Sequence, residues 1–263
     1  MFMEPTETPY DLRWRMFKIP VRVHPMFWIF TAALGWSATE RGMQYLFLWI
    51  AAVFVSNLVH ELGHVFMGRF FGSDGHIVLY SFGGLAIGSS NLRNRWQRVA
   101  VYFAGPGAGF LLAVLLWFCA PYVARNEPTA WFLQEMFYIN MFWGLLNLLP
   151  IWPLDGGQIS REVCGQVFPW KGLVVSLGIS AGAAGILALF KSGLFLQQVH
   201  TREAVLRLAT ALPRWLAGPW LYLVLPDMFM AIFFAILAVS SIQTYQAERQ
   251  RHHWKEEEFP WAR

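Results

Sequence analysis

Three ionisable residues, His60, Glu61 and His64, lie within five positions of an otherwise apolar stretch. Histidines at positions i and i+4 lie one turn apart on the same face of a helix, so both imidazoles can reach one zinc ion. Glu61 can accept a proton from a water molecule whose pKa the metal lowers to about 7. A charge inside a bilayer costs about 2.5–3.5 kcal/mol on insertion scales, so these groups need a compensating partner. We therefore interpret His60 and His64 as ligands of one zinc ion and Glu61 as a general base.

The third ligand must come from elsewhere, because a hydrolytic zinc site has three protein ligands and one open position. Asp155 is the best candidate, since the prolines and glycines of residues 150–157 end an apolar segment and turn the chain sharply around this one acid. The alternative is an Asp-Gly turn without a ligand role. Membrane topology favours ligation, because the segments that carry His64 and Asp155 are predicted to end at the same face of the membrane.

Composition indicates that these residues are positioned by membrane-spanning helices. The 263 residues are 56% hydrophobic and only 14% charged, whereas soluble domains have about 25% charged residues. Six segments approach the roughly 20 apolar residues that a spanning helix needs. They cover about 20–37, 44–71, 97–122, 129–151, 171–190 and 226–245. The predicted fold class is an all-α polytopic membrane protein with about six transmembrane helices, and the alternating leucines and arginines of about 200–218 predict an interfacial helix.

The predicted organisation is a single integral-membrane domain over residues 1–263. Its catalytic core covers about 20–170, its C-terminal helices cover about 171–245, and a charged tail covers 246–263. Most of the Lys and Arg residues fall on the side of the predicted spans that carries both termini, which predicts cytoplasmic termini in a bacterial plasma membrane. The net charge of +4 comes without a dense basic run, so no nucleic-acid partner is expected.

Together the two metal motifs resemble those of the site-2 protease family of intramembrane zinc metalloproteases. The resemblance rests on residues 60–64 and 147–157, on the Gly-Pro sequence in 104–109, and on the Gly-Gly sequence in 81–86. It covers about residues 20–170 and is closest to small six-span members without PDZ or CBS domains. Many members carry Asn where this chain has Gly109, so no polar role is assigned to that position.

The resemblance implies a short membrane-associated β segment near residues 76–90, beside the metal. Ser81, Phe82, Gly83 and Gly84 would then bind an unwound transmembrane substrate as an added strand. The alternative is a re-entrant loop that only packs. Asn147 would orient the substrate or stabilise the oxyanion, with a hydrogen bond between helices as an equal alternative. The implied activity is hydrolysis of peptide bonds in or near transmembrane segments of membrane-protein substrates, as in regulated intramembrane proteolysis.

Two other functions compete with this interpretation. A membrane metal transporter often has two related halves around its site, and neither of the last two apolar segments contains a second histidine pair. A non-catalytic scaffold of the same family would not need Glu61, which is intact. The sequence predicts neither the substrate nor the oligomeric state.

Overall fold

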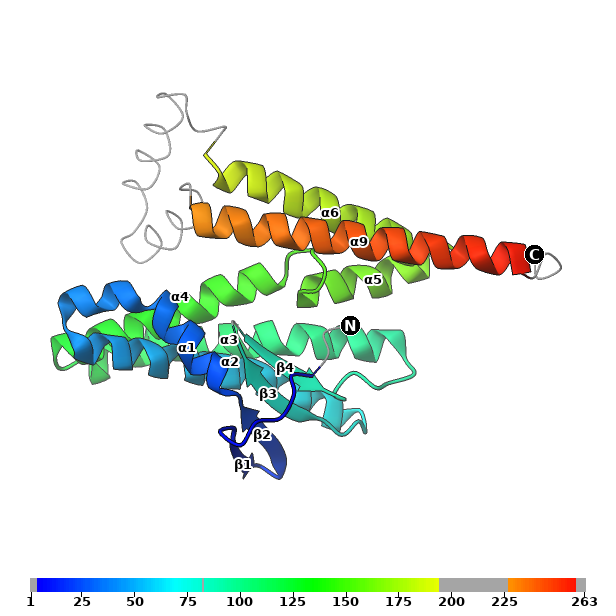
Figure 1. The fold of residues 1–263 in the computed structure, drawn as a ribbon. Coiled ribbons are helices and arrows are strands. Elements are labelled where there is room, and N and C mark those ends of the chain that lie inside the picture. Colours follow the sequence, from blue (N-terminus) through cyan, green and yellow to red (C-terminus); the bar gives the residue numbers. More distant parts are fainter. Residues whose placement is uncertain (1–3, 82, 194–226, 259–263) are drawn as a thin grey trace. The chain divides into compact units, whose positions relative to one another are not determined.

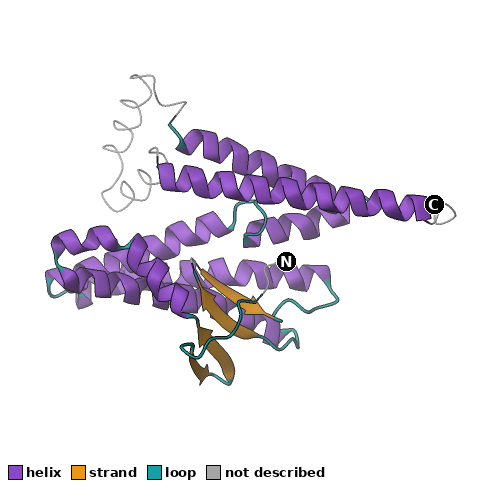
Figure 2. Ribbon diagram, in the orientation of Figure 1, coloured by secondary structure: helices purple, strands orange, loops and turns teal. Residues whose placement is uncertain are grey.

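The fold is known from a computed structural model that describes residues 4–81, 83–193 and 227–258 (Figure 1). The described chain is mainly helical and contains one small sheet (Figure 2). Its internal contacts divide it into two compact units, Met1–Leu148 and Leu149–Arg263. The mainly helical fold class and the β segment near 76–90 are confirmed. The organisation as a single domain stays a prediction.

The first unit is built around a long central helix. Its helices are α1 (Pro25–Leu34), the short 3-10 helix η1 (Trp36–Arg41), α2 (Met43–Phe70), α3 (Arg95–Val123) and α4 (Glu127–Asn147). Side chains cap two of them, since Asn94 accepts a hydrogen bond from the Trp96 amide and Asn126 accepts one from the Thr129 amide. Helix α2 packs against both α3 and α4. The histidine motif therefore lies on the helix with neighbours on two sides.

A four-stranded sheet in the order β1-β2-β3-β4 packs on α2. The strands are β1 (Leu12–Met16), β2 (Ile19–Val23), β3 (His76–Tyr80) and β4 (Gly83–Ile87). The outer two pairings are antiparallel and the β2–β3 pairing is parallel. Alternate β2 residues Ile19, Val21 and Val23 are buried in a core that also contains Leu62 and Val65 of α2. The sheet is thereby fixed to the helical turns that surround His64.

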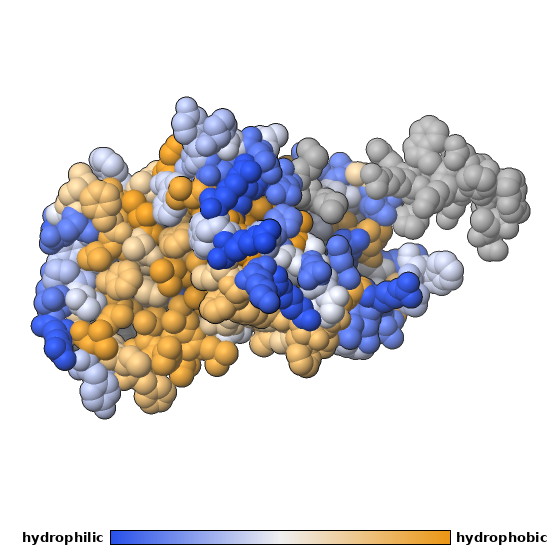
Figure 3. All heavy atoms as spheres, turned by 90° about the horizontal axis from the view of Figure 1, so that it is seen from below, coloured by the Kyte–Doolittle hydropathy of each residue, from blue (hydrophilic) through white to orange (hydrophobic). Residues whose placement is uncertain are grey.

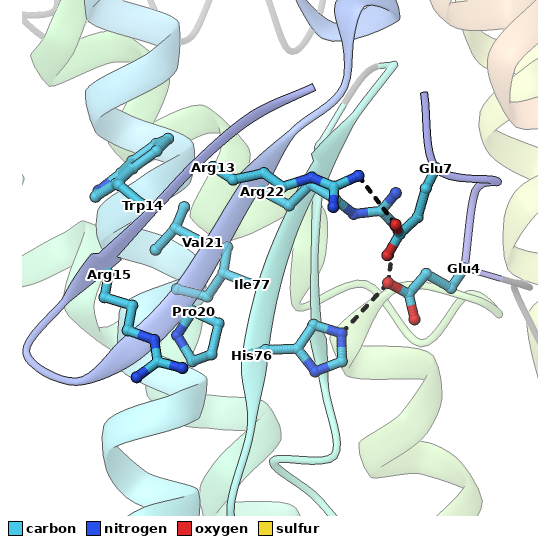
Figure 4. A pocket seen from close by; sticks show the side chains of 10 residues that line it. All are labelled: Glu4, Glu7, Arg13, Trp14, Arg15, Pro20, Val21, Arg22, His76 and Ile77. Atoms are coloured by element: carbon cyan, nitrogen blue, oxygen red, sulfur yellow. Dashed lines mark hydrogen bonds and ion pairs between the residues drawn. The ribbon is translucent and has the colours of Figure 1, made fainter. Parts of the chain in front are cut away.

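The opposite face of the sheet carries a pair of arginines. Arg13 and Arg22 are directly opposite each other in the β1–β2 register, a position in which like charges destabilise a sheet. The N-terminal segment Glu4–Asp11 supplies the compensating charges, and Figure 4 shows two of its acids, Glu4 and Glu7, beside the arginines. Glu7 pairs with Arg13 at 3.0 Å, and Glu4 and Asp11 pair with Arg22 at 2.7 and 3.1 Å. Glu4, Glu7 and the two arginines line an open cavity of about 370 Å³.

Asp11 is the best-anchored acid of this segment. Burial alone would raise the pKa of its carboxyl group, but hydrogen bonds from Thr8 and Arg22 and the charge of Arg22 lower that pKa to about 2. The Thr8 hydroxyl and amide donate at 2.5 and 3.1 Å. Asp11 is therefore ionised at every physiological pH and holds the segment against β2.

The second unit contains three described helices. They are α5 (Asp155–Val167), α6 (Gly172–Lys191) and α9 (Met228–Glu258). Helices α6 and α9 pack along each other, and α5 packs against α6. Asp227 caps α9 by accepting hydrogen bonds from the amides of Phe229 and Met230, as expected for an acid before a helix.

The expectation of six spans is not confirmed. Four described helices are long and apolar enough to cross a membrane, namely α2, α3, α6 and residues Met228–Arg249 of α9. The first expected span, 20–37, is wrong: part of it forms β2, and α1 is only 10 residues long, about half of what a bilayer requires. Helix α4 is continuous over 21 residues, but it is not among those four helices. The predicted interfacial helix at 200–218 lies outside the described residues.

The surface agrees with insertion into lipid. A broad area of apolar side chains is bounded by polar side chains on two sides (Figure 3). Large apolar residues of the spanning helices are more than half exposed, including Phe47, Phe103, Leu111 and Phe118. Exposed apolar surface of this extent marks a contact with a membrane or with another protein.

Candidate metal centre

His60 and His64 face each other on α2. Both residues are buried, their Nε2 atoms lie 3.2 Å apart, and their ring planes are nearly perpendicular. Two nitrogens bound to one tetrahedral zinc ion at about 2.0–2.1 Å would lie about 3.3 Å apart. The two imidazoles therefore already have the separation that a shared zinc ion requires.

Helix α3 orients the second of these rings. The Nδ1 atom of His64 lies 2.7 Å from the carbonyl oxygen of Val101. A carbonyl oxygen only accepts, so Nδ1 carries the proton and Nε2 keeps its lone pair for a metal. A Cβ atom added at Gly105 would lie 2.2 Å from Nε2 of His64. The absence of a side chain at Gly105 therefore makes room for the imidazole.

Glu61 lies beneath the edge strand of the sheet. Its side chain is buried, and a Cβ atom added at Gly84 would lie 2.3 Å from Cγ and 2.6 Å from Oε1 of Glu61. The backbone of β4 thus passes directly over the carboxyl group. Any larger residue at position 84 would displace either the strand or the side chain of the predicted base.

Close contacts fix α2 against its two neighbouring helices. A Cβ atom at Gly63 would lie 2.4 Å from the Ala104 carbonyl oxygen, so this glycine lets α2 and α3 approach. On the other side, Asn140 of α4 donates a 2.8 Å hydrogen bond to the Ser56 hydroxyl. A Cβ atom at Gly109 would lie only 3.3 Å from Oδ1 of Asn140. The sequence did not reveal this Ser56–Asn140 contact, which sets the rotation of α2.

The predicted substrate-binding residues lie partly at the sheet edge. Ser81 is in the β3–β4 turn with a φ of 47°, and Gly83 and Gly84 begin β4. Phe82 lies outside the described residues. The amide nitrogen of Asn147 donates to the Trp143 carbonyl oxygen of its own helix at 3.0 Å. The structure thus places Gly84 against Glu61, as the prediction requires. The side-chain NH2 group of Asn147 instead donates a hydrogen bond within α4.

In the second unit, Asp155 is the first residue of α5. The loop before it is held by two helices that sequence reasoning left without a role. The Trp152 amide donates to the Ser180 hydroxyl of α6 at 2.6 Å, and that hydroxyl lies 2.7 Å from the Ser241 hydroxyl of α9. Ser241 also donates to the Trp152 carbonyl oxygen at 3.4 Å. Two buried serines therefore fix the backbone three residues before Asp155.

The donor set has the chemistry of a zinc site. His60 and His64 of the first unit offer two imidazole nitrogens, and Asp155 of the second unit offers a carboxylate oxygen. Two imidazole nitrogens and one carboxylate oxygen are a usual ligand set of catalytic zinc. Glu61, next to the first histidine in the sequence, would remain available for proton transfer.

Comparison with known proteins gives the family. The model of peptidase family M50 matches residues 48–129 and 122–189, which is more than half of the chain and includes all four of these residues. The chain belongs to peptidase family M50. It is 29% identical to stage IV sporulation protein FB of Bacillus subtilis, over 92% of this chain and 70% of that protein. It is 28% identical to a zinc metalloprotease of Methanocaldococcus jannaschii, over 67% of this chain and 53% of that protein.

The fold agrees with this assignment. The structure of the site-2 protease from Methanocaldococcus jannaschii matches with a TM-score of 0.55 and 21% identity, over 88% of this chain and 95% of that one. The resemblance to site-2 proteases is therefore confirmed, and this M50 chain is an integral membrane protein. It spans about half the length of the archaeal metalloprotease that it matches in sequence.

Proposed function

We propose that this M50 protein is an intramembrane zinc endopeptidase that hydrolyses peptide bonds in or near transmembrane segments of other membrane proteins. The observation that carries the proposal is the 3.2 Å separation of the His60 and His64 Nε2 atoms on the helix that also carries the buried Glu61. A metal transporter would not need a carboxyl group held beneath the edge of a sheet. A non-catalytic scaffold would need neither the paired histidine nitrogens nor the buried carboxyl group of Glu61.

Asp155 is proposed as the third ligand. Its carboxylate would add to the two imidazoles the oxygen donor that a catalytic zinc site commonly has. The serine-held loop before α5 restricts the backbone that carries it. A ligand whose backbone is fixed loses little conformational freedom when it binds the metal, which increases affinity.

Zinc, when bound, lowers the pKa of a water molecule and polarises the substrate carbonyl group. The protein moves the proton: the Glu61 carboxylate accepts it from the water and later donates it to the leaving amine. His64 contributes through its fixed tautomer, because its proton is held by the Val101 carbonyl oxygen. Burial of both residues keeps bulk water away from the reaction.

The substrate is proposed to bind as an added strand at β4. A helical peptide bond is shielded by its own hydrogen bonds, so a transmembrane substrate must unwind before it is cut. Within the described sheet, β4 pairs only with β3 and leaves its outer edge to another strand. Ser81, Phe82, Gly83 and Gly84 would form this binding edge, and Asn147 would orient the substrate or the oxyanion.

The proposed location is the plasma membrane of a bacterium, with both termini in the cytoplasm. The distribution of Lys and Arg between the apolar segments supports this orientation. The match to a protein of Bacillus subtilis over most of this chain supports a bacterial membrane.

Purified protein and a single-span substrate in detergent test the activity. We expect Glu61→Gln to keep about one zinc ion per chain and to lose at least 10²-fold in kcat, because only proton transfer is removed. Glu127→Gln is the matched control, since this acid is exposed and its ion pair in the described part of the chain is with the exposed Arg41. Normal turnover by Glu61→Gln would refute the role of the base. Zinc uptake into proteoliposomes without cleavage would favour the transporter.

A further inference from the structure

Asn57 carries a buried hydrogen-bonding atom without a partner. It lies on α2, one turn before Glu61, and is 3% exposed. Its amide nitrogen donates to the Val53 carbonyl oxygen at 3.0 Å, but its Oδ1 atom has no hydrogen-bond partner among the described residues. Buried carbonyl oxygens in proteins almost always accept a hydrogen bond, and inside a bilayer lipid cannot supply one. Such an atom requires a functional explanation.

A second buried asparagine in the same unit shows the usual arrangement. Asn140 donates to the Ser56 hydroxyl and to the Met136 carbonyl oxygen, both at 2.8 Å. It joins two helices, which is a structural role. Asn57 bonds only within its own helix, so its amide group contributes no described link between elements.

The unpaired oxygen faces the start of the edge strand. A Cβ atom added at Gly83 would lie 4.0 Å from Oδ1 of Asn57 and 3.9 Å from the Trp143 ring. The next residue, Gly84, lies against Glu61. The first two residues of β4 therefore pass over Asn57 and then over Glu61.

We propose that Asn57 is a substrate-binding residue, whose Oδ1 atom accepts a hydrogen bond from a backbone N–H of the peptide that pairs with β4. This inference rests on the proposed protease function and adds a contact to it. Four helical residues rise by about 6 Å at about 1.5 Å each. An extended peptide covers that distance in about two residues at about 3.3 Å each. The N–H group that Asn57 binds thus belongs to a substrate residue about two positions from the peptide bond that is hydrolysed with Glu61 as the base.

Thermal unfolding in detergent, without substrate, separates this role from a structural one. Leucine has nearly the shape of asparagine and no polar atoms. Asn57→Leu removes an unpaired oxygen, so its Tm should equal or exceed that of the wild type. Asn140→Leu is the matched control and should lower Tm, because it breaks a hydrogen bond between α2 and α4. An equal loss of Tm in both variants would show that Asn57 is structural and would overturn the proposal.

Cleavage kinetics test the substrate contact itself. The probe is a synthetic single-span peptide that the wild type cuts, with its cleavage site located by mass spectrometry. Asn57→Leu should lower kcat/KM about tenfold, the effect of one hydrogen bond made to the substrate. Replacing the backbone amide two residues from the cut by an ester, which has no N–H, should weaken wild-type cleavage by a similar factor.

The combination of the two changes gives the decisive result. In Asn57→Leu the same ester should cause no further loss, because the hydrogen bond is already absent. Independent, multiplicative losses, or unchanged kcat/KM in Asn57→Leu, would overturn the role of Asn57 while leaving the protease function intact. Absence of any cleavage by the wild type would instead overturn the proposed function, and this inference with it.

Discussion

The Nδ1 atom of His64 lies 2.7 Å from the carbonyl oxygen of Val101, so helix α3 determines which nitrogen of this imidazole carries the proton. The same helix supplies Gly105, whose missing side chain leaves space for the other ring nitrogen. One helix thus sets both the tautomer and the position of a proposed ligand that is carried by another. Partners of this kind change metal affinity by about 10–100-fold when they are removed.

Gly105→Ala should impair metal binding. The added methyl group would lie 2.2 Å from Nε2 of His64, so the ring must move from the position that suits a shared zinc ion. We expect zinc affinity and cleavage to fall by at least tenfold, as measured by equilibrium metal titration and peptide hydrolysis. Gly107→Ala is the control, because its methyl group would make only an ordinary 3.8 Å contact with Phe103. Equal zinc affinity in the two variants would contradict this account.

Asp155→Ala should remove the third ligand. Zinc bound by two histidines alone dissociates readily, so the purified variant should contain well below one equivalent by mass spectrometry of the metal. Glu162→Ala changes another acid of α5 and should keep its zinc. Removal of zinc from the wild type by a chelator should abolish cleavage, and added zinc should restore it. A full equivalent of tightly held zinc in Asp155→Ala would exclude this ligand.

Ser180→Ala and Ser241→Ala should each loosen the loop before Asp155. Each variant loses a buried hydrogen bond to the Trp152 backbone or to the other serine, worth about 1 kcal/mol. Zinc affinity should fall several-fold, and the double variant should lose less than the product of the two, because the serines act as one unit. Ser192→Ala is the control, since its exposed hydroxyl donates to the Leu189 carbonyl oxygen of its own helix end. If the loss of zinc affinity in the double variant equals the product of the two single losses, the serines act separately.

Acid should weaken the attachment of the N-terminal segment. The pKa of Asp11 is about 2 in the folded protein and 3.8 for a free carboxyl group. Its contribution to stability is therefore complete above about pH 4 and is lost as the pH falls toward 2. Asp11→Asn should increase proteolytic cleavage within residues 4–12 at pH 5, and this difference from the wild type should shrink toward pH 2. Glu7→Gln, which alters a largely exposed ion pair, should have a smaller effect.

The features of the fold and of the candidate site that the sequence predicted correctly are those that depend on the spacing of residues close together in the chain. His60 and His64 follow helical periodicity, and the β-branched run of β3 follows strand propensity. Strands β1 and β2 were missed, although Ile19, Val21 and Val23 alternate with Pro20 and Arg22. This alternation was overlooked because most of these residues belong to the apolar segment at about 20–37, which was counted as a span. The wrong span at about 20–37 came from weighing total hydrophobicity before periodicity.

Contacts between distant parts of the chain could not be predicted in this way. Ser56 and Asn140 are 84 positions apart, and Ser180 and Ser241 are 61 apart. A serine in an apolar helix has many potential partners, and only the packing of the helices selects one. The same holds for Asn57, whose unpaired oxygen becomes visible only when the surrounding side chains are in place.

The buried serine pair has a consequence for inhibition. Because the Ser180 and Ser241 hydroxyls meet between α6 and α9 and hold the Trp152 backbone, a small molecule or protein segment wedged between these helices would release the loop that carries Asp155. Such a compound would weaken the proposed zinc site and would need no zinc-chelating group. Its selectivity would depend on the shape of the contact between α6 and α9 and not on metal chemistry.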